Sequence, residues 1–103
     1  MSLRPKIKNW FDLFLMEGDD GHWPVTLELK DGMQSMAKNR PTKDKKWLYI
    51  TSVEKSAEIC GFQVGDIIMQ LGPLHAECHS MEDFKLITKD HGFAIISVYR
   101  IPK

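Results

Sequence analysis

The side chains best suited to metal chemistry lie close together in the second half of the chain. His75, Cys78 and His79 fall within five residues, and imidazole and thiolate are ligands that zinc prefers. No second pair of ligands stands elsewhere at a spacing typical of zinc sites. We therefore expect no metal site and no cofactor.

Other reactive side chains lack the surroundings that catalysis requires. Asp19 and Asp20 are adjacent carboxylates in a turn, where solvation is the expected state. Ser52, Ser56 and Ser80 have no Gly-x-Ser-x-Gly context, and the chain has no glycine-rich phosphate loop. The sequence therefore predicts a protein that is not an enzyme.

Size and composition indicate one globular domain over residues 1–103. The chain is 43% hydrophobic and 27% charged, and its 14 basic residues balance 14 acidic ones. A neutral chain has no global attraction to nucleic acid. No apolar stretch approaches the roughly 18 residues that cross a membrane. Residues 1–5 carry no signal-peptide pattern, and we interpret them as a disordered or cloning-derived start.

The two cysteines, Cys60 and Cys78, are too few for a disulfide framework. This favours a reducing, cytoplasmic setting. Cys60 is expected on the inner face of a short helix, where a thiol packs as a small apolar group.

Apolar runs of period two or of continuous character predict a mostly β chain. The first, residues 10–16, is expected to be buried on both faces or covered by the chain's own end. The second, residues 25–30, alternates and is expected to be half-buried. Further strands are predicted at 47–53, 67–71 and 93–100, with a short one at 74–77. Residues 33–46 form a long polar loop, and its segment 38–46 carries about four net positive charges.

Two helices are predicted between these strands. Residues 56–60 form a short one, and Gly61 suits the left-handed position that ends it. Ser80–Lys89 is longer, with Ser80 as N-cap and Asp83 three residues on. The expected fold is α+β and mostly β: a partly open antiparallel barrel or sandwich of five to six strands, capped by two helices.

The order of these elements and their spacing resemble a PDZ domain from about Lys6 to Arg100. The most specific part runs from Gly65-Asp66-Ile67-Ile68 through Ser80-Met81-Glu82 to Gly92. Ser56-Ala57 to Cys60-Gly61 resembles the family's short first helix. The resemblance implies a module that adds a peptide as an extra strand between residues 25–30 and the helix 81–89.

One loop departs from the family pattern. PDZ domains usually carry Gly-Leu-Gly-Phe before the second strand, and its amides hold a partner's C-terminal carboxylate. Here residues 22–25 read His22-Trp23-Pro24-Val25, and Pro24 has no N–H to offer. The preceding segment adds negative charge from Glu17, Asp19 and Asp20. We expect weakened recognition of a C-terminal carboxylate.

The resemblance also assigns roles in the groove. Trp23, Val25, Leu27 and Thr88 would line the pocket for the last ligand side chain. Met81 would face the side chain two positions upstream, so an apolar (class II-like) ligand is expected there. Lys85 would meet an acidic ligand group. The expected peptide-binding set is Trp23, Pro24, Val25, Thr26, Leu27, Leu29, Met81, Lys85 and Thr88.

The expected partner is a C-terminal or internal peptide of another protein. The chain would be part of an intracellular scaffold or signalling protein, cytoplasmic or at the membrane periphery, as a monomer or weak dimer. Three alternatives stay open. One is a peptide-sensing regulatory domain of an enzyme such as a serine protease. Another is a structural domain with its groove filled by Trp23 or the N-terminal strand. The third is contact with phospholipid or an acidic partner through Lys38, Arg40, Lys43, Lys45 and Lys46.

Overall fold

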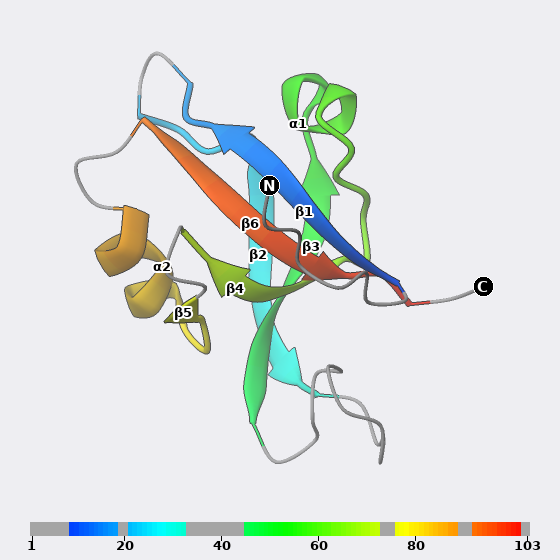
Figure 1. Cartoon of the computed structure of the whole chain (residues 1–103), viewed down its shortest axis with the longest axis vertical. Helices are drawn as coiled ribbons and strands as arrows, with labels where there is room; N and C mark the ends of the chain where they lie inside the picture. Colours follow the sequence, from blue (N-terminus) through cyan, green and yellow to red (C-terminus); the bar gives the residue numbers. More distant parts are fainter. Residues whose placement is uncertain (1–8, 19–20, 33–44, 73–75, 89–91, 102–103) are drawn as a thin grey trace, which may run out of the picture.

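The chain folds into one antiparallel sheet of six strands with two helices (Figure 1). The computed structural model describes residues 9–18, 21–32, 45–72, 76–88 and 92–101. Its elements are β1 (Trp10–Met16), β2 (Val25–Asp31), β3 (Lys46–Val53), α1 (Lys55–Ile59), β4 (Ile67–Leu71), β5 (Ala76–Glu77), α2 (Met81–Thr88) and β6 (Phe93–Tyr99). The fold class predicted from the sequence, mostly β with two helices, is confirmed.

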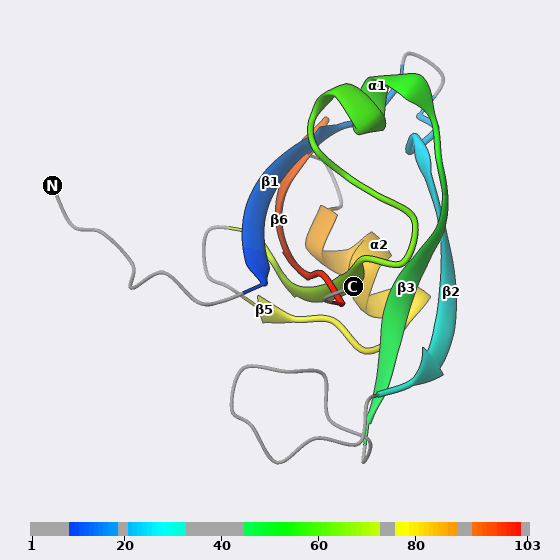
Figure 2. The ribbon, with the colours of Figure 1, turned by 90° about the vertical axis from the view of Figure 1, so that its right-hand side faces the viewer.

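The strand order places β1 and β2 at the two ends of the sheet. The order is β1-β6-β4-β3-β2, with β5 paired to β4. The sheet curls so strongly that α2 lies inside its curve (Figure 2). The same view shows β2 at the outer rim of the sheet, beside β3. No helix in the described ranges is long and apolar enough to span a membrane.

Two apolar clusters occupy opposite faces of the sheet, because successive side chains of a strand alternate. Ile68 of β4 belongs to the main core, which Ala57 of α1 and Phe84 of α2 cover. Ile67 and Met69, its neighbours in sequence, belong to the second cluster together with Trp47 and Tyr99.

The prediction that residues 10–16 are buried on both faces is wrong. Leu15 is fully buried, but Phe14 is 44% and Met16 60% exposed. The inner face of β1 packs on the core, whereas no described segment covers the outer side chains at this end of the strand. The other expectation, covering by the chain's own end, concerns residues outside the described ranges.

The position expected for Cys60 is also wrong, because its side chain is exposed. α1 is a single short helix that ends at Ile59, and Ala57 is its buried residue. Cys60 lies in the turn that follows and points to solvent. Gly61 then adopts a φ of 105°, which only glycine reaches without strain.

The start of α2 follows the predicted capping pattern with one change. The backbone N–H of Asp83 donates to Ser80 Oγ at 3.1 Å, as an N-cap requires. The Asp83 carboxylate accepts from the backbone N–H of His79 at 2.9 Å. The side chain of Asp83 therefore bonds to His79, the residue before the N-cap Ser80, and not to Ser80 itself.

Candidate functional site

The outer edge of β2 is the part of the sheet most suited to receiving another chain. β2 pairs with β3 on one side, and no described strand pairs with its other side. The bonds from Glu54 N to Pro24 O (2.9 Å) and from Gly32 N to Lys45 O (3.1 Å) fix which residues face β3. An exposed edge of this kind is a template for strand addition.

Hydrogen-bonded and non-bonded positions alternate along an antiparallel strand. Counting from the two bonds above, the backbones of Thr26, Glu28 and Lys30 face β3, and those of Val25, Leu27 and Leu29 face outward. The backbone of Thr26 therefore faces β3 and not the open edge, and its carbonyl also accepts a bond from the Thr51 hydroxyl at 3.3 Å. Its side chain is exposed, and its part in peptide binding stays a prediction.

The three outward-facing residues form a gradient of burial. The Val25 side chain is 9% exposed within the main core, and Leu27 is partly buried against that core. Leu29 is 44% exposed. An added strand would thus meet a deep apolar position at the start of β2 and an open one at its end.

Trp23 links the start of β2 to α2. Its ring meets Phe84 edge-on, with the ring centroids 5.6 Å apart and an interplanar angle of 84°. Such edge-to-face pairs contribute about 0.5–1.5 kcal/mol beyond their burial. Thr88 is buried, and its hydroxyl donates to the Phe84 carbonyl at 2.7 Å. Phe84, which sequence reasoning did not assign to the site, therefore contacts both residues expected in one pocket.

The helix presents a stripe of mixed character. Met81, Lys85 and Thr88 are four and three residues apart, so they share one face of α2. Met81 is 40% exposed, and Thr88 is 7% exposed. Lys85 is exposed and makes no ion pair with any described residue. This face of α2 is thus accessible and apolar at Met81 and buried at Thr88.

The loop before β2 is fastened to Glu54, a residue that sequence reasoning missed. Its carboxylate contacts His22 Nε2 at 2.5 Å, and its N–H donates to Pro24 O. Pro24 is buried, and the N–H of Trp23 has no hydrogen-bond partner among the described residues. Glu54 lies 32 residues after His22, so only the fold reveals this contact. Asp19 and Asp20 lie outside the described ranges.

The basic segment is described only at its end. Lys45 lies 3.6 Å from Glu77, and Lys46 lies 2.7 Å from Asp31, so both are ion-paired. Lys38, Arg40 and Lys43 lie outside the described residues.

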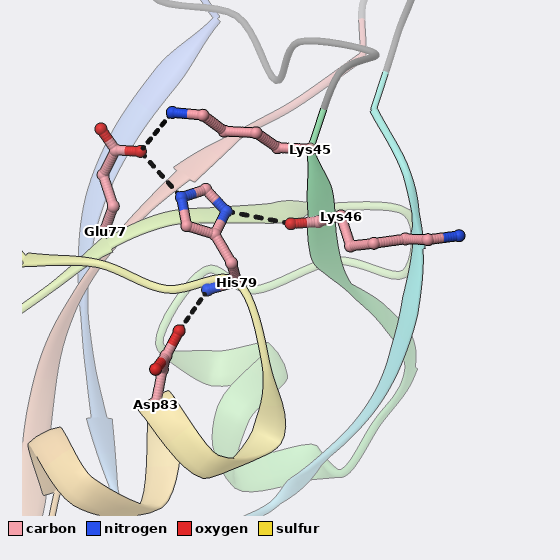
Figure 3. A network of polar contacts seen from close by, with 5 residues as sticks. All are labelled: Lys45, Lys46, Glu77, His79 and Asp83. Atoms are coloured by element: carbon pink, nitrogen blue, oxygen red, sulfur yellow. Dashed lines mark hydrogen bonds and ion pairs between the residues drawn. The ribbon is translucent and has the colours of Figure 1, made fainter.

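Of the three side chains weighed as zinc ligands, Figure 3 shows His79, whose ring is engaged in other bonds. His79 places Nδ1 2.9 Å from the Lys46 carbonyl and Nε2 2.8 Å from Glu77 Oε1, and its ring meets Trp47 edge-on. Cys78 is buried, and its thiol donates to the Ser80 carbonyl at 3.5 Å. Burial raises the pKa of this thiol to about 12. His75 lies outside the described ranges. Within them, no three His, Cys, Asp or Glu side chains could hold a metal ion.

No protein-family model matches this chain, and no curated protein matches its sequence.

Proposed function

We propose that this chain is a protein-interaction module of the PDZ type, which binds an extended peptide along the free edge of β2 and opposite α2. The observation that carries the proposal is the outward-facing backbone of Val25, Leu27 and Leu29 on a strand that ends the sheet. The element order, the Gly65-Asp66 turn and the Trp23–Phe84 contact support the same assignment.

Strand addition explains both affinity and selectivity. Main-chain hydrogen bonds to the β2 edge would contribute about 0.5–1.5 kcal/mol each whatever the ligand sequence. Alternate side chains of the guest would point toward the apolar strip of Val25, Leu27 and Met81. Because this strip is apolar, a ligand with hydrophobic residues at alternating positions is favoured. Lys85 would select an acidic residue beside them.

The loop chemistry favours an internal segment or a weakly held C-terminus. Pro24 supplies no N–H, which leaves Trp23 and Val25 as the donors nearest a terminal carboxylate. The His22 ring is already engaged by Glu54. A carboxylate would therefore meet fewer donors than the family's usual loop provides.

The test uses one hexapeptide in three forms, with Phe third from the end and Val last. The forms are the free acid, the C-terminal amide, and the same six residues between Gly-Ser linkers. Amide NMR spectra should shift at Val25, Leu27 and Leu29, and less at Glu28 and Lys30, with affinities of the three forms within about fivefold of each other. The proposal fails if millimolar amounts of all three forms leave the β2 amides unmoved.

Two alternative functions stay open. A peptide-sensing domain of a larger enzyme, such as a serine protease, would use the same edge, and the parent protein's activity would distinguish it. Phospholipid contact through residues 38–46 would be seen as sedimentation with anionic vesicles that is lost at high salt. The ion pairs of Lys45 and Lys46 make this second alternative weaker.

A further inference from the structure

The opposite end of the sheet carries an exposed apolar surface that peptide capture at β2 does not explain. β1 and β6 run side by side (Figure 1), and their register places Phe14 opposite Ile95 and Met16 opposite Phe93. These four side chains share the outer face and are 44%, 39%, 60% and 48% exposed, respectively. The rings of Phe14 and Phe93 stack with centroids 5.0 Å apart.

No described strand pairs with the outer edge of β1 at the same place. The bonds from Glu17 N to Gly92 O and from Arg100 N to Asn9 O show that the odd-numbered residues of β1 face β6. Phe14 and Met16 therefore direct their N–H and C=O groups away from the sheet. β1 contains no proline, lysine or bulge to block pairing, although these are the usual protections of an edge strand.

From the unpaired edge and the exposed apolar face, we propose that β1 pairs with β1 of a second copy of this chain. The two strands run antiparallel, and the two-fold axis of the dimer passes at Phe14. In this register Phe14 faces the partner's Phe14, and Met16 faces the partner's Asp12. Each strand then uses the same residues, as a two-fold contact requires. The two exposed apolar surfaces join into one across the axis.

The near absence of charge on β1 favours a second copy of this chain over a charged partner. Asp12 is the only charged residue of β1, and its carboxylate already accepts bonds from the Ser97 hydroxyl at 2.5 Å and from Trp10 Nε1 at 3.3 Å. The proposed register keeps the two Asp12 residues about four strand positions apart, roughly 14 Å. The chain has a net charge of zero, so two copies do not repel each other.

Area predicts a weak dimer. The four side chains expose on the order of 400 Å² per copy, so two copies and their strand edges bury roughly 1,000 Å², below the about 1,200–2,000 Å² of stable interfaces. The expected dissociation constant is therefore between about 0.1 and 1 mM. This association goes beyond the proposed peptide binding, which uses the other end of the sheet.

Analytical ultracentrifugation of the full chain from 10 µM to 1 mM tests the proposal. The weight-average mass should rise from that of one chain, 11.9 kDa, toward twice that value. Phe14→Lys and Met16→Lys should stay monomeric throughout. Ile59→Lys is the matched control, because Ile59 is 76% exposed on α1, and it should associate like the unmodified chain.

Phe14→Pro separates the strand edge from the apolar face. Its missing N–H points away from β6, so the β1–β6 bonds are kept and only outward pairing is lost. We expect a monomer with a near-normal melting curve. If this variant does not fold, the Phe14→Lys and Met16→Lys variants still test whether β1 forms the dimer contact.

Three outcomes would overturn the proposal. They are a chain that is monomeric at 1 mM, association that survives Phe14→Lys, and a mass that climbs past the dimer without a plateau. The first would assign this face to another occupant, such as residues 1–8 of the same chain or a different protein.

Discussion

The guanidinium of Arg100 donates two hydrogen bonds to the buried carboxylate of Asp66, each at 2.8 Å. Arg100 also donates to the Gly61 carbonyl at 2.7 Å, and Asp66 accepts the N–H of Gln63 at 3.0 Å. The pair thus ties the end of β6 to the turn that leads into β4. The hydrogen bond to Asp66 raises the pKa of Arg100, which keeps its charge fixed.

Removing the cation should strongly destabilise the fold. Arg100→Gln leaves the Asp66 carboxylate, which is 1% exposed, without its counter-charge. Breaking a buried pair from one side costs about 3–5 kcal/mol, and partial exposure of Arg100 lowers the expected loss to about 2–3 kcal/mol. Urea unfolding followed by tryptophan fluorescence measures it.

The control for this variant is Lys46→Gln, which breaks the exposed ion pair with Asp31. An exposed pair contributes at most about 1 kcal/mol. Equal losses in the two variants would show that the Arg100–Asp66 pair is no more important than a surface contact.

The two thiols should differ in reactivity and in their effect on stability. Cys60 is exposed and Cys78 buried, so a thiol reagent at pH 8 should modify one site per folded chain, and Cys60→Ser should remove that reaction. Rapid modification of Cys78 in the folded protein would contradict its burial.

The raised pKa of Cys78 also predicts a pH dependence. The folded thiol keeps its proton up to about pH 12, whereas the unfolded thiol releases it near its ordinary pKa of about 8.5. The unfolded state then binds fewer protons, so the unfolding free energy falls as pH rises from about 9 toward 12. Cys78→Ala should flatten this decline in urea titrations at several pH values. A decline of the same steepness in Cys78→Ala would show that another group causes it.

Restoring a donor in the loop before β2 should improve carboxylate binding if the proposed function is correct. Pro24→Gly returns an N–H to that position, and a charge-assisted bond contributes about 1.5–3 kcal/mol. The free-acid hexapeptide should then bind about tenfold tighter or more, by NMR titration, while its amide keeps its affinity. The substitution should cost about 1 kcal/mol of folding free energy through added chain freedom.

Pro24→Ala provides the same N–H with less freedom and serves as the matched variant. If neither substitution changes the affinity for the free acid, the missing donor is not what limits carboxylate binding.

Local patterns located most of the elements because they depend on near neighbours. The alternation in residues 25–30 and the apolar run at 67–71 predicted strands, and the structure has β2 and β4 there. The Ser80 cap and the glycine at position 61 marked helix ends. Each of these signals is complete within a few residues.

The candidate site was predicted less completely. The sequence pointed to β2 and α2, but the contact of Trp23 with Phe84 joins residues 61 positions apart. The bond between His22 and Glu54 is likewise long-range. Neither contact produces a periodic pattern in the sequence, so neither could be predicted from the spacing of residues.

The amino-acid order alone determined which faces of each strand are apolar and where the chain turns, since period and glycine geometry act locally. Only the tertiary structure decided which apolar faces receive a covering layer. Leu15 is buried while Phe14 beside it is exposed, because burial depends on which distant segments pack against each face.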